Sequence, residues 1–552
     1  MSNQKLSPRL DVQTRANRLT AITLGLVVFA LAAMLRFSYL NWDLAQWIHP
    51  DEGHMRAITG AVRWPDSLAS YFDTQASPLN PRNHDKVYSY GTLPLFAARA
   101  VTEWLERACA PEPDPFTALV ARRILDNLGR SSAPSNRLCA PGTFTWTYNA
   151  FVGRHLSALA DLGTVLLIGL LGHTLYGRRT GILAMALAAV NAFMIQQAHF
   201  YTVDSAATFF TVLTGLFAVL AGKYPTDRPP WAWLALAGLS SGLATACKVS
   251  AALAAGLAAL GALWWARRAS TLAPAIARDP EANQTASATI DTDSDRPGSV
   301  EDQWSSVITV PTVVLRVVAP LLLAALLSLL AFRVGQPYAF EGPGLLGVRP
   351  NAAWFDRLAQ ISEEQSGAID YPSGRQWTAR LPLIFPVGNL IVWGMGLPLG
   401  LAALWGWVQS GWELVRGDRR HLVLWLWTAA YIAFYASRWV KAMRYFLPVY
   451  PFLIVIAAYT VQRYLAEAIR DHIDHGKGIS IRPPASVAEP TSEGRAQVAR
   501  RARMWVGVAL TLVVLIGTTA WGVALFGIYA RPHTRIAASR WIYDNEIGRA
   551  HV

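Results

Sequence analysis

The chain has 552 residues, of which 53% are hydrophobic and only 15% are charged, and its formal net charge is +13. Soluble proteins carry about 25% charged residues, whereas the apolar residues here fall in blocks of about 17–25, the length of a membrane-spanning helix. The composition therefore excludes a soluble protein. Because the basic residues cluster between the apolar blocks, they indicate the positive-inside rule rather than a nucleic-acid surface.

Eleven stretches are predicted to span the membrane. They lie near residues 19–40, 154–176, 180–198, 205–222, 231–246, 249–266, 308–332, 387–408, 421–437, 445–463 and 504–527. Arg9, Arg15 and Arg18 precede the first span, which predicts a cytoplasmic N-terminus. When the spans are counted from the N-terminus, the loops rich in Lys and Arg fall on the cytoplasmic side. Residues 42–153 then form a long first loop on the outer side.

Two features of this outer loop lead to structural expectations. Residues 93–108 are apolar but hold four charged side chains, so we expect a helix at the outer interface. A span here would instead invert the topology of everything downstream. Cys109 and Cys139 fall in the same loop, and an oxidising outer compartment would allow a disulfide between them; two unpaired thiols are the alternative.

The predicted organisation follows from these spans. It comprises a cytoplasmic tail (1–18), a transmembrane module (19–464) with a disordered cytoplasmic loop (268–305), a basic cytoplasmic linker (465–503), a last span (504–527) and an outer tail (528–552). The terminal sequence EIGRAHV (546–552) is what a common sequencing adapter encodes when translated. We therefore expect the natural chain to continue past Asn545.

Five polar motifs lie at the outer ends of the predicted spans. They are HPDEGHM (49–55), HFYTVDSA (199–206), CKVS (247–250), RVGQPYAFEGP (333–343) and SRWVKAMRYFLPVYP (437–451). Because the parity of the spans places all five on one side, their acids and cations are predicted to lie near one membrane surface. Acidic clusters that face several cations indicate a site for an anionic lipid and a hydroxyl acceptor.

Three carboxylates on this face are candidate catalytic groups: Asp51, Glu52 and Asp204. Pro50 is predicted to start a short helix, and adjacent helical residues do not face the same way. Asp51 and Glu52 are therefore expected to differ in role, with Glu52 orienting substrate or supporting the structure. The alternative for the pair is an ordinary helix start that suits the helix dipole, and for Asp204 it is a helix cap.

Lys248, Arg333 and Arg444 are the candidate ligands of a donor phosphate, and the alternative is snorkelling at span ends. Arg333 is favoured because RVGQPYAF ends a span abruptly with Gly and Pro. In the second span, Arg154 and Asp161 are seven residues apart and share a helix face, which indicates a structural pair rather than catalysis.

Five residues near these charges are candidates for an acceptor-binding or structural role: His49, His54, His199, Tyr90 and Gln336. The histidines raise the question of a metal ion, but no ligand spacing supports one. We therefore assign no metal ligand and no required cofactor, and a divalent metal stays an open alternative.

The sequence resembles the GT-C superfamily of polyprenyl-phosphate-sugar-dependent glycosyltransferases. It is similar to bacterial relatives of the protein O-mannosyltransferases and of the aminoarabinose transferase that acts on lipid A. The likeness covers residues 19–464 and is carried by Asp51-Glu52, Asp204, YGTLPLF (90–96), GRHLSAL (153–159), GQPYAF (335–340) and RYFLPVYPFL (444–453). It implies an all-α polytopic membrane protein, a GT-C-like bundle of about 11 transmembrane helices with a long first periplasmic loop, in which Asp51 is the base.

The chemistry of the residues agrees with this resemblance. A sugar on a polyprenyl phosphate already has a good leaving group, so the reaction needs a base for the acceptor hydroxyl. Attack from the opposite face inverts the anomeric centre, and cations stabilise the departing phosphate. We therefore expect an inverting, mannosyltransferase-like enzyme that moves a sugar from a polyprenyl-phosphate carrier to a hydroxyl of a protein, glycan or lipid.

The enzyme is expected in the bacterial inner membrane, with its active site on the periplasmic face and no nucleic-acid partner. Two other classes stay open. A lipid-carrier flippase or transporter would show ionisable residues in mid-membrane, inverted repeats or broken helices. A non-catalytic assembly subunit predicts that Asp51 is dispensable.

Overall fold

The computed structural model describes residues 8–88, 90–127, 142–278, 310–369, 372–476 and 492–547 of the chain. Most of the loop predicted to be disordered lies outside these residues, as does Cys139. Where the prediction and the description overlap, residues 268–278 continue a helix instead of starting the loop. Both ends of the predicted linker 465–503 are likewise helical.

The described residues form helices almost throughout. The N-terminal half contains α1 (Pro8–Phe37), α2 (Pro50–Ala61), α3 (Leu68–Tyr71), α4 (Leu93–Glu106), α5 (Pro115–Asn127), α7 (Asn149–Tyr176), α8 (Arg178–Ala189), α9 (Ala192–Ala198), α10 (Asp204–Lys223), α11 (Trp231–Cys247), the 3-10 helix η4 (Val249–Ala254) and α12 (Ala255–Arg278). The C-terminal half contains α14 (Val310–Gly335), α15 (Ala352–Ser366), α16 (Ile384–Asn389), η8 (Leu390–Gly394), α17 (Leu397–Val415), α18 (Leu422–Ala436), η10 (Met443–Val449), α19 (Tyr450–Gly476), α20 (Ser492–Tyr529) and α21 (Thr534–Ile542). Two short antiparallel strands, β1 (Phe340–Glu341) and β2 (Arg349–Pro350), precede α15.

Among the described residues, seven helices are long and apolar enough to cross a membrane, or up to eight if α8 and α9 form one bent span. The fold is therefore that of an all-helical, multi-span membrane protein, but the predicted count of eleven spans is not confirmed. α8 and α9 are bent by 59°, because Asn191 begins a new helix by accepting a hydrogen bond from the backbone N–H of Met194.

The span predicted at 387–408 is also interrupted. Its chain forms α16 and η8, breaks, and begins again as α17 at Leu397. Gly396 has a φ of +77°, a conformation that residues with a side chain rarely adopt, and Pro398 follows in the first turn of α17. Because the whole segment is apolar, its hydropathy gave no indication of the break.

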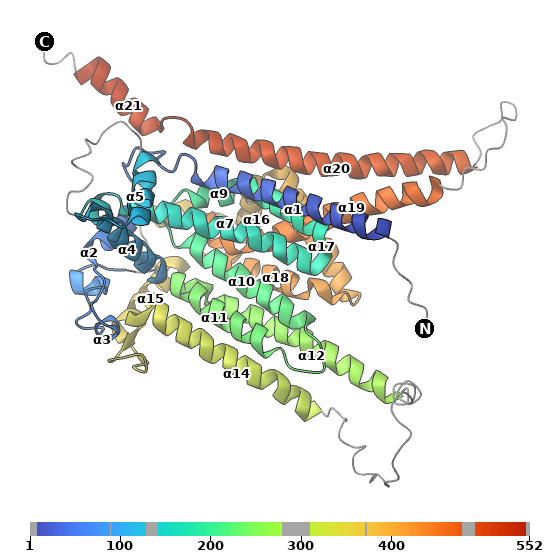
Figure 1. Cartoon of the computed structure of the whole chain (residues 1–552), viewed down its shortest axis with the longest axis horizontal. Coiled ribbons are helices and arrows are strands. Elements are labelled where there is room, and N and C mark those ends of the chain that lie inside the picture. The colour runs from blue at the N-terminus through green and yellow to red at the C-terminus, as the bar shows by residue number, and fades with distance from the viewer. Residues whose placement is uncertain are drawn as a thin grey trace, which may run out of the picture.

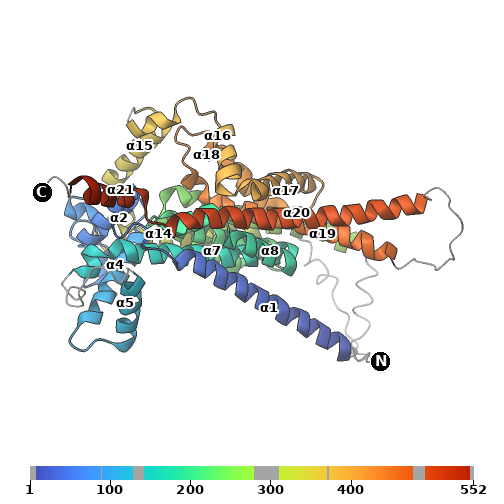
Figure 2. The same ribbon diagram turned by 90° about the horizontal axis from the view of Figure 1, so that it is seen from above.

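α19 lies at the centre of the bundle, because 89% of its most apolar window is buried. The corresponding share is 11% for α1, 22% for α14 and 17% for α20, so these helices lie at the periphery of the bundle. Figures 1 and 2 show α1 and α20 running along the outside of the bundle.

The two ends of the bundle differ in what they carry. α2, α3, α4 and α5 gather at one end, whereas α1 begins, α12 ends and α19 leads to α20 at the opposite end (Figure 1). The helices of the predicted outer loop thus lie together at one end of the bundle, and the side of the membrane that this end faces stays a prediction. α4 has 14 residues, too few for a span, and it packs on α2 and α7. Its place at the outer interface stays a prediction.

Cysteine chemistry is consistent with an oxidising compartment around this end. Cys109 is disulfide-bonded, whereas Cys247 is free and buried at the end of α11.

The membrane orientation can be tested by labelling introduced cysteines. A cysteine at exposed Gln75 is expected to react with a membrane-impermeant maleimide in intact cells, because it lies in the predicted outer loop. A cysteine at Asp227, which is 65% exposed in the connection between α10 and α11, should react only after permeabilisation. The unaltered protein is the control, and the reverse labelling pattern would invert the topology.

Candidate active site

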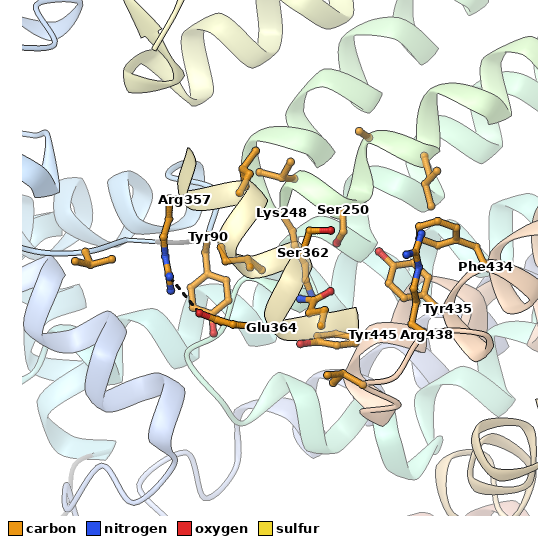
Figure 3. A pocket seen from close by; sticks show the side chains of 18 of the residues that line it. Tyr90, Lys248, Ser250, Arg357, Ser362, Glu364, Phe434, Tyr435, Arg438 and Tyr445 are labelled. Atoms are coloured by element: carbon orange, nitrogen blue, oxygen red, sulfur yellow. Dashed lines mark hydrogen bonds and ion pairs between the residues drawn. The ribbon is translucent and has the colours of Figure 1, made fainter. Parts of the chain in front are cut away.

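A cavity of about 900 Å³ lies at the end of the bundle that carries the predicted outer motifs. Its wall comes mainly from η4, α15, the C-terminal end of α18 and the connection that follows α18, and His54 of α2 and Tyr90 also line it. Figure 3 shows Lys248 and Ser362 between the Arg357–Glu364 ion pair on one side and Arg438 on the other. Cations and tyrosines thus surround a space large enough for a sugar and a phosphate.

The first ion pair of the site joins α10 to the end of α11. Asp204 is the first residue of α10, and Lys248 follows the last residue of α11. The Lys248 Nζ lies 2.6 Å from the Asp204 Oδ1, and it also lies 4.6 Å from the centre of the Tyr445 ring. Lys248 lines the cavity and Asp204 stands behind it, so the two predicted functional residues form one unit.

The second pair joins α2 to η10. Pro50 begins α2, as predicted, and Asp51 in its first turn forms an ion pair with Arg444. Both side chains are partly exposed, at 20% for Asp51 and 29% for Arg444. The Arg444 Cζ lies 5.7 Å from the centre of the Tyr445 ring that Lys248 also contacts. Lys248 and Arg444 therefore contact the same ring. The distance between their charged groups cannot exceed the sum of their two distances to its centre.

His49 lies next to both pairs. Burial, assisted by the charges of Arg444 and Arg154, lowers the pKa of His49 to about 4, although Asp204 opposes this shift. The ring is stacked on Phe200, with centroids 4.4 Å apart, and its buried Nδ1 has no hydrogen-bond partner among the described residues. A neutral imidazole with a free nitrogen is therefore available beside the carboxylates.

Glu52 belongs to a different, fully buried cluster. The Arg154 guanidinium binds both Glu52 oxygens at 2.7 Å and both Asp43 oxygens at 2.9 Å, and it donates to the Leu40 carbonyl at 2.7 Å. The backbone N–H of Tyr201 donates to the same Glu52 side chain at 2.8 Å. These contacts enclose Glu52 completely, which favours the supporting role over a catalytic one.

The predicted partnership of Arg154 with Asp161 is wrong. Asp161 instead accepts a hydrogen bond from Arg36 of α1 at 2.6 Å. Residues seven apart on a helix are separated by about 10 Å along its axis, which is too far for direct pairing although they share a face.

Arg333 is also a structural residue and does not line the cavity. It is 1% exposed, and it donates hydrogen bonds to the carbonyls of Pro337, Gly344 and Leu345. With its donors directed at backbone oxygens, this guanidinium holds the loop after α14. Its contacts and its place outside the cavity do not favour Arg333 as a phosphate ligand.

The remaining candidates divide between the cavity and the scaffold. Tyr90 and His54 line the cavity, and burial raises the pKa of Tyr90 to about 12, so its hydroxyl stays a hydrogen-bond donor. Gln336 accepts from the backbone N–H and the hydroxyl of Thr92, both at 2.6 Å. His199 is fully buried, with a ring nitrogen 2.7 Å from the Ile195 carbonyl.

Sequence reasoning missed Arg438, Arg357 and Tyr445 in this site. Arg438 lines the cavity and is exposed to it, and no carboxylate among the described residues pairs with it. Its position in the motif SRWVKAMRYFLPVYP could have marked it. Arg357 lies on the amphipathic α15, which the sequence did not connect to the site.

The outer acids and histidines do not form a three-ligand metal cluster in the described part of the chain. The set that does is Glu413, Asp418 and His421, whose ligand atoms all lie within 4.8 Å of one another. These residues flank the start of α18, whereas the end of α18 lines the cavity, so the set lies on the order of 20 Å away. Arg463 and Arg420 already pair with the two carboxylates.

Residues 140–273 match the family model described as dolichyl-phosphate-mannose-protein mannosyltransferase. This segment, which contains Arg154, Asp204 and Lys248, is a minority of the chain. Over this segment the match confirms the resemblance drawn from the sequence.

The chain is also similar to the solved structures of two other proteins. The archaeal oligosaccharyltransferase AglB from Archaeoglobus fulgidus, in complex with an inhibitory peptide and a dolichol-phosphate, is 14% identical, with a TM-score of 0.47, over 96% of this chain and 58% of that one. ArnT from Cupriavidus metallidurans, bound to undecaprenyl phosphate, is 15% identical, with a TM-score of 0.44, over 93% of this chain and 76% of that one. The chain thus spans less than two thirds of the length of AglB. No curated protein sequence matches it.

Proposed function

We propose that the protein is an inverting membrane glycosyltransferase that moves a sugar from a polyprenyl phosphate to a hydroxyl acceptor. The observation that carries the proposal is the family match, because the matched segment supplies Lys248 at the wall of a cavity and its ion-pair partner Asp204 behind it. The cavity adds the cations that a phosphate needs, and Asp51 adds a carboxylate beside them.

Three cations are placed to hold the donor phosphate. Lys248 and Arg438 line the cavity, and Arg444 shares the Tyr445 ring with Lys248. Charge-assisted hydrogen bonds from such groups are stronger than neutral ones. They gain further strength as the phosphate takes up the electron pair of the breaking bond, so they favour the transition state.

Asp51 is the proposed general base. Its carboxylate takes the proton from the acceptor hydroxyl as the acceptor oxygen forms a bond to the anomeric carbon. The bond from that carbon to the phosphate oxygen breaks on the opposite face, and its electron pair leaves with the polyprenyl phosphate. Arg444 pairs with Asp51 in this structure, so a phosphate that attracts Arg444 would also free the base.

The charges inside the bundle do not favour the alternative of a flippase or transporter. Arg36 and Asp161 are both buried, but Arg36 also donates to the carbonyls of Ala188 and Ala189. These hydrogen bonds satisfy backbone carbonyls at the C-terminal end of α8, where the chain bends into α9. A saturated structural pair of this kind is not a mobile relay for a transported group.

Mannose is the sugar that we propose to test first, because the matched family is described by it. The acceptor is proposed to be a protein, glycan or lipid hydroxyl at the periplasmic face of a bacterial inner membrane. The protein with a panel of polyprenyl-phosphate sugars in liposomes should release polyprenyl phosphate only when an acceptor is present. If no combination of donor and acceptor releases polyprenyl phosphate, the proposed function is wrong.

Lys248→Met is expected to weaken binding of polyprenyl phosphate by about 10- to 100-fold, because one charge-assisted contact is lost. Binding would be measured by competition with a fluorescent lipid phosphate. Lys86→Met, at an exposed lysine of the outer loop, is the matched control and should bind normally. The single variant also leaves Asp204 without its ion-pair partner, which could disturb the site. The double variant Asp204→Asn/Lys248→Met removes that unpaired charge, so it reports the loss of phosphate binding alone. Normal binding by this double variant would exclude Lys248 as a phosphate ligand.

A further inference from the structure

Three side chains with metal-binding chemistry meet where α17 turns into α18, and we refer to them as the hairpin cluster. Glu413 lies in the last turn of α17, Asp418 follows the turn at Gly417, and His421 ends the short 3-10 helix η9 (Arg419–His421). Gly417 has a φ of +103°, which lets the chain reverse within a few residues. This local turn brings one ligand atom of each side chain within 4.8 Å of the others.

His421 is the residue of the hairpin cluster that points to a bound ion. Its side chain is only 1% exposed, and its Nε2 has no hydrogen-bond partner among the described residues. This atom lies 2.9 Å from the Glu413 Oε2 and 3.6 Å from the Asp418 Oδ2. A nitrogen lone pair and two carboxylate oxygens repel one another at such distances unless a positive charge lies between them. A proton on Nε2 is the alternative charge, but it forms no hydrogen bond with either carboxylate in this geometry.

The separations within the hairpin cluster agree with those of ligands around one ion. Zinc binds histidine nitrogen and carboxylate oxygen at about 2.0–2.2 Å, so two ligands at a tetrahedral angle are about 3.3–3.5 Å apart. The distances of 2.9 Å and 3.6 Å from the His421 Nε2 lie on either side of this value. Small side-chain rotations would therefore complete the site. Asp418 is partly exposed, which leaves room for water as a fourth ligand.

Tyr176 orients the His421 ring from the end of α7. The Tyr176 oxygen lies 2.9 Å from the His421 Nδ1, and the two rings are stacked with centroids 5.4 Å apart. When Nδ1–H donates to this oxygen, Nε2 carries the lone pair that a metal ion requires. A hydrogen bond at the second ring nitrogen is the usual way in which proteins orient a metal-binding histidine.

Glu413 can bind an ion without losing its present partners. Arg463 pairs with its Oε1, whereas Oε2 is the oxygen next to His421. The Tyr459 hydroxyl donates to Oε2 at 2.9 Å, and this oxygen has a second lone pair. Arg463 also pairs with Glu467 at 2.7 Å, so it keeps a carboxylate partner in either case.

Arg420 is the one competitor that an ion would have to displace. It pairs with the Asp418 Oδ2 at 2.6 Å, and this is the oxygen that lies nearest His421. The Arg420 side chain is exposed, so it can move into solvent without becoming a buried charge. The affinity of the hairpin cluster for a metal ion should therefore depend on Arg420.

We propose that Glu413, Asp418 and His421 bind one divalent transition-metal ion, for which zinc is the probe to use first. An imidazole with two carboxylates suits such an ion, whereas calcium and magnesium prefer ligand sets made of oxygen alone. The ion would fasten the α17–α18 hairpin to α7 through the His421–Tyr176 contact. Since the full length of α18 separates this site from the active-site cavity, its role is structural and does not depend on the proposed function.

The test is a zinc titration of the full chain, purified in detergent with an affinity tag that contains no histidine and stripped of metal with a chelator. Calorimetry and elemental analysis should give one tightly bound zinc per chain. Asp418→Asn is expected to weaken this binding at least about 100-fold, because a lost ligand should cost no less than a lost partner of a ligand. Asparagine can still cap η9, so the variant should fold. His421→Gln should weaken binding by a similar factor.

His173→Gln is the matched control, because His173 is an exposed histidine of α7 that does not belong to the hairpin cluster. It should bind zinc as the unaltered protein does. Equal binding by Asp418→Asn and the unaltered protein would place the zinc at other histidines and overturn the proposal. Absence of bound zinc in the unaltered protein would also overturn it and leave a proton as the charge at His421.

Arg420→Met gives a result that loss of a structural contact does not explain. Removing the competing cation should tighten zinc binding by several-fold, whereas weaker binding would contradict Asp418 as a ligand and overturn the proposal. Zinc should also raise the thermal unfolding midpoint of the unaltered protein, because an ion that binds only the folded state stabilises it. An unchanged midpoint at saturating zinc would exclude the fastening role.

Discussion

Asp51→Asn is expected to lower sugar transfer by about 10²- to 10⁴-fold, the usual contribution of a general base. Asparagine keeps the size of the side chain but cannot take the proton of the acceptor hydroxyl. The variant should still insert and fold, because Asp51 is partly exposed and lies outside the buried cluster around Arg154. Transfer would be followed by the release of polyprenyl phosphate in single-turnover assays.

Binding of the lipid phosphate separates loss of the base from general damage to the site. Arg444 pairs with Asp51 in this structure, so Asp51→Asn leaves Arg444 free and should not weaken phosphate binding. Asp66→Asn, at an exposed acid of the same loop, should transfer and bind normally. Near-normal transfer by Asp51→Asn would return the Pro-Asp-Glu sequence to the role of an ordinary helix start.

Arg154→Met is expected to lower the free energy of unfolding by about 3–5 kcal/mol, the usual result of removing one partner of a buried ion pair. The loss should be large because Asp43 and Glu52 would both remain buried without their cation. Thermal unfolding of the detergent-solubilised protein, followed by size-exclusion chromatography, would measure the change. Arg123→Met removes an exposed arginine of α5 and is the matched control.

Glu52→Gln distinguishes the supporting role of Glu52 from a catalytic one. It should also destabilise the protein, because one carboxylate partner of Arg154 is lost, whereas the molecules that remain folded should transfer sugar at near the normal rate. A variant as stable as the unaltered protein but inactive would instead place Glu52 in the chemistry.

Local patterns predicted the parts of the site that depend on one segment at a time. Pro50 predicted the start of α2, and the acids after it lie in the first turn of that helix. The parity of the apolar blocks predicted that residues 51, 204, 248 and 444 would lie near one membrane surface, and in the structure they form two ion pairs near Tyr445. The breaks in α8–α9 and at Gly396 were missed, because hydropathy does not register a change in helix direction.

The sequence by itself determined that this is a helical membrane protein with charged motifs gathered at one end of its bundle. Composition and periodicity are enough for that, because an apolar block must satisfy its backbone hydrogen bonds as a helix in lipid. Only the tertiary structure decided what each charge does. Arg333 is occupied by backbone carbonyls and Glu52 by Arg154, whereas Arg438 is left facing the cavity. The physical reason is that the role of a buried charge depends on which groups saturate it, and those groups come from segments far away in the chain.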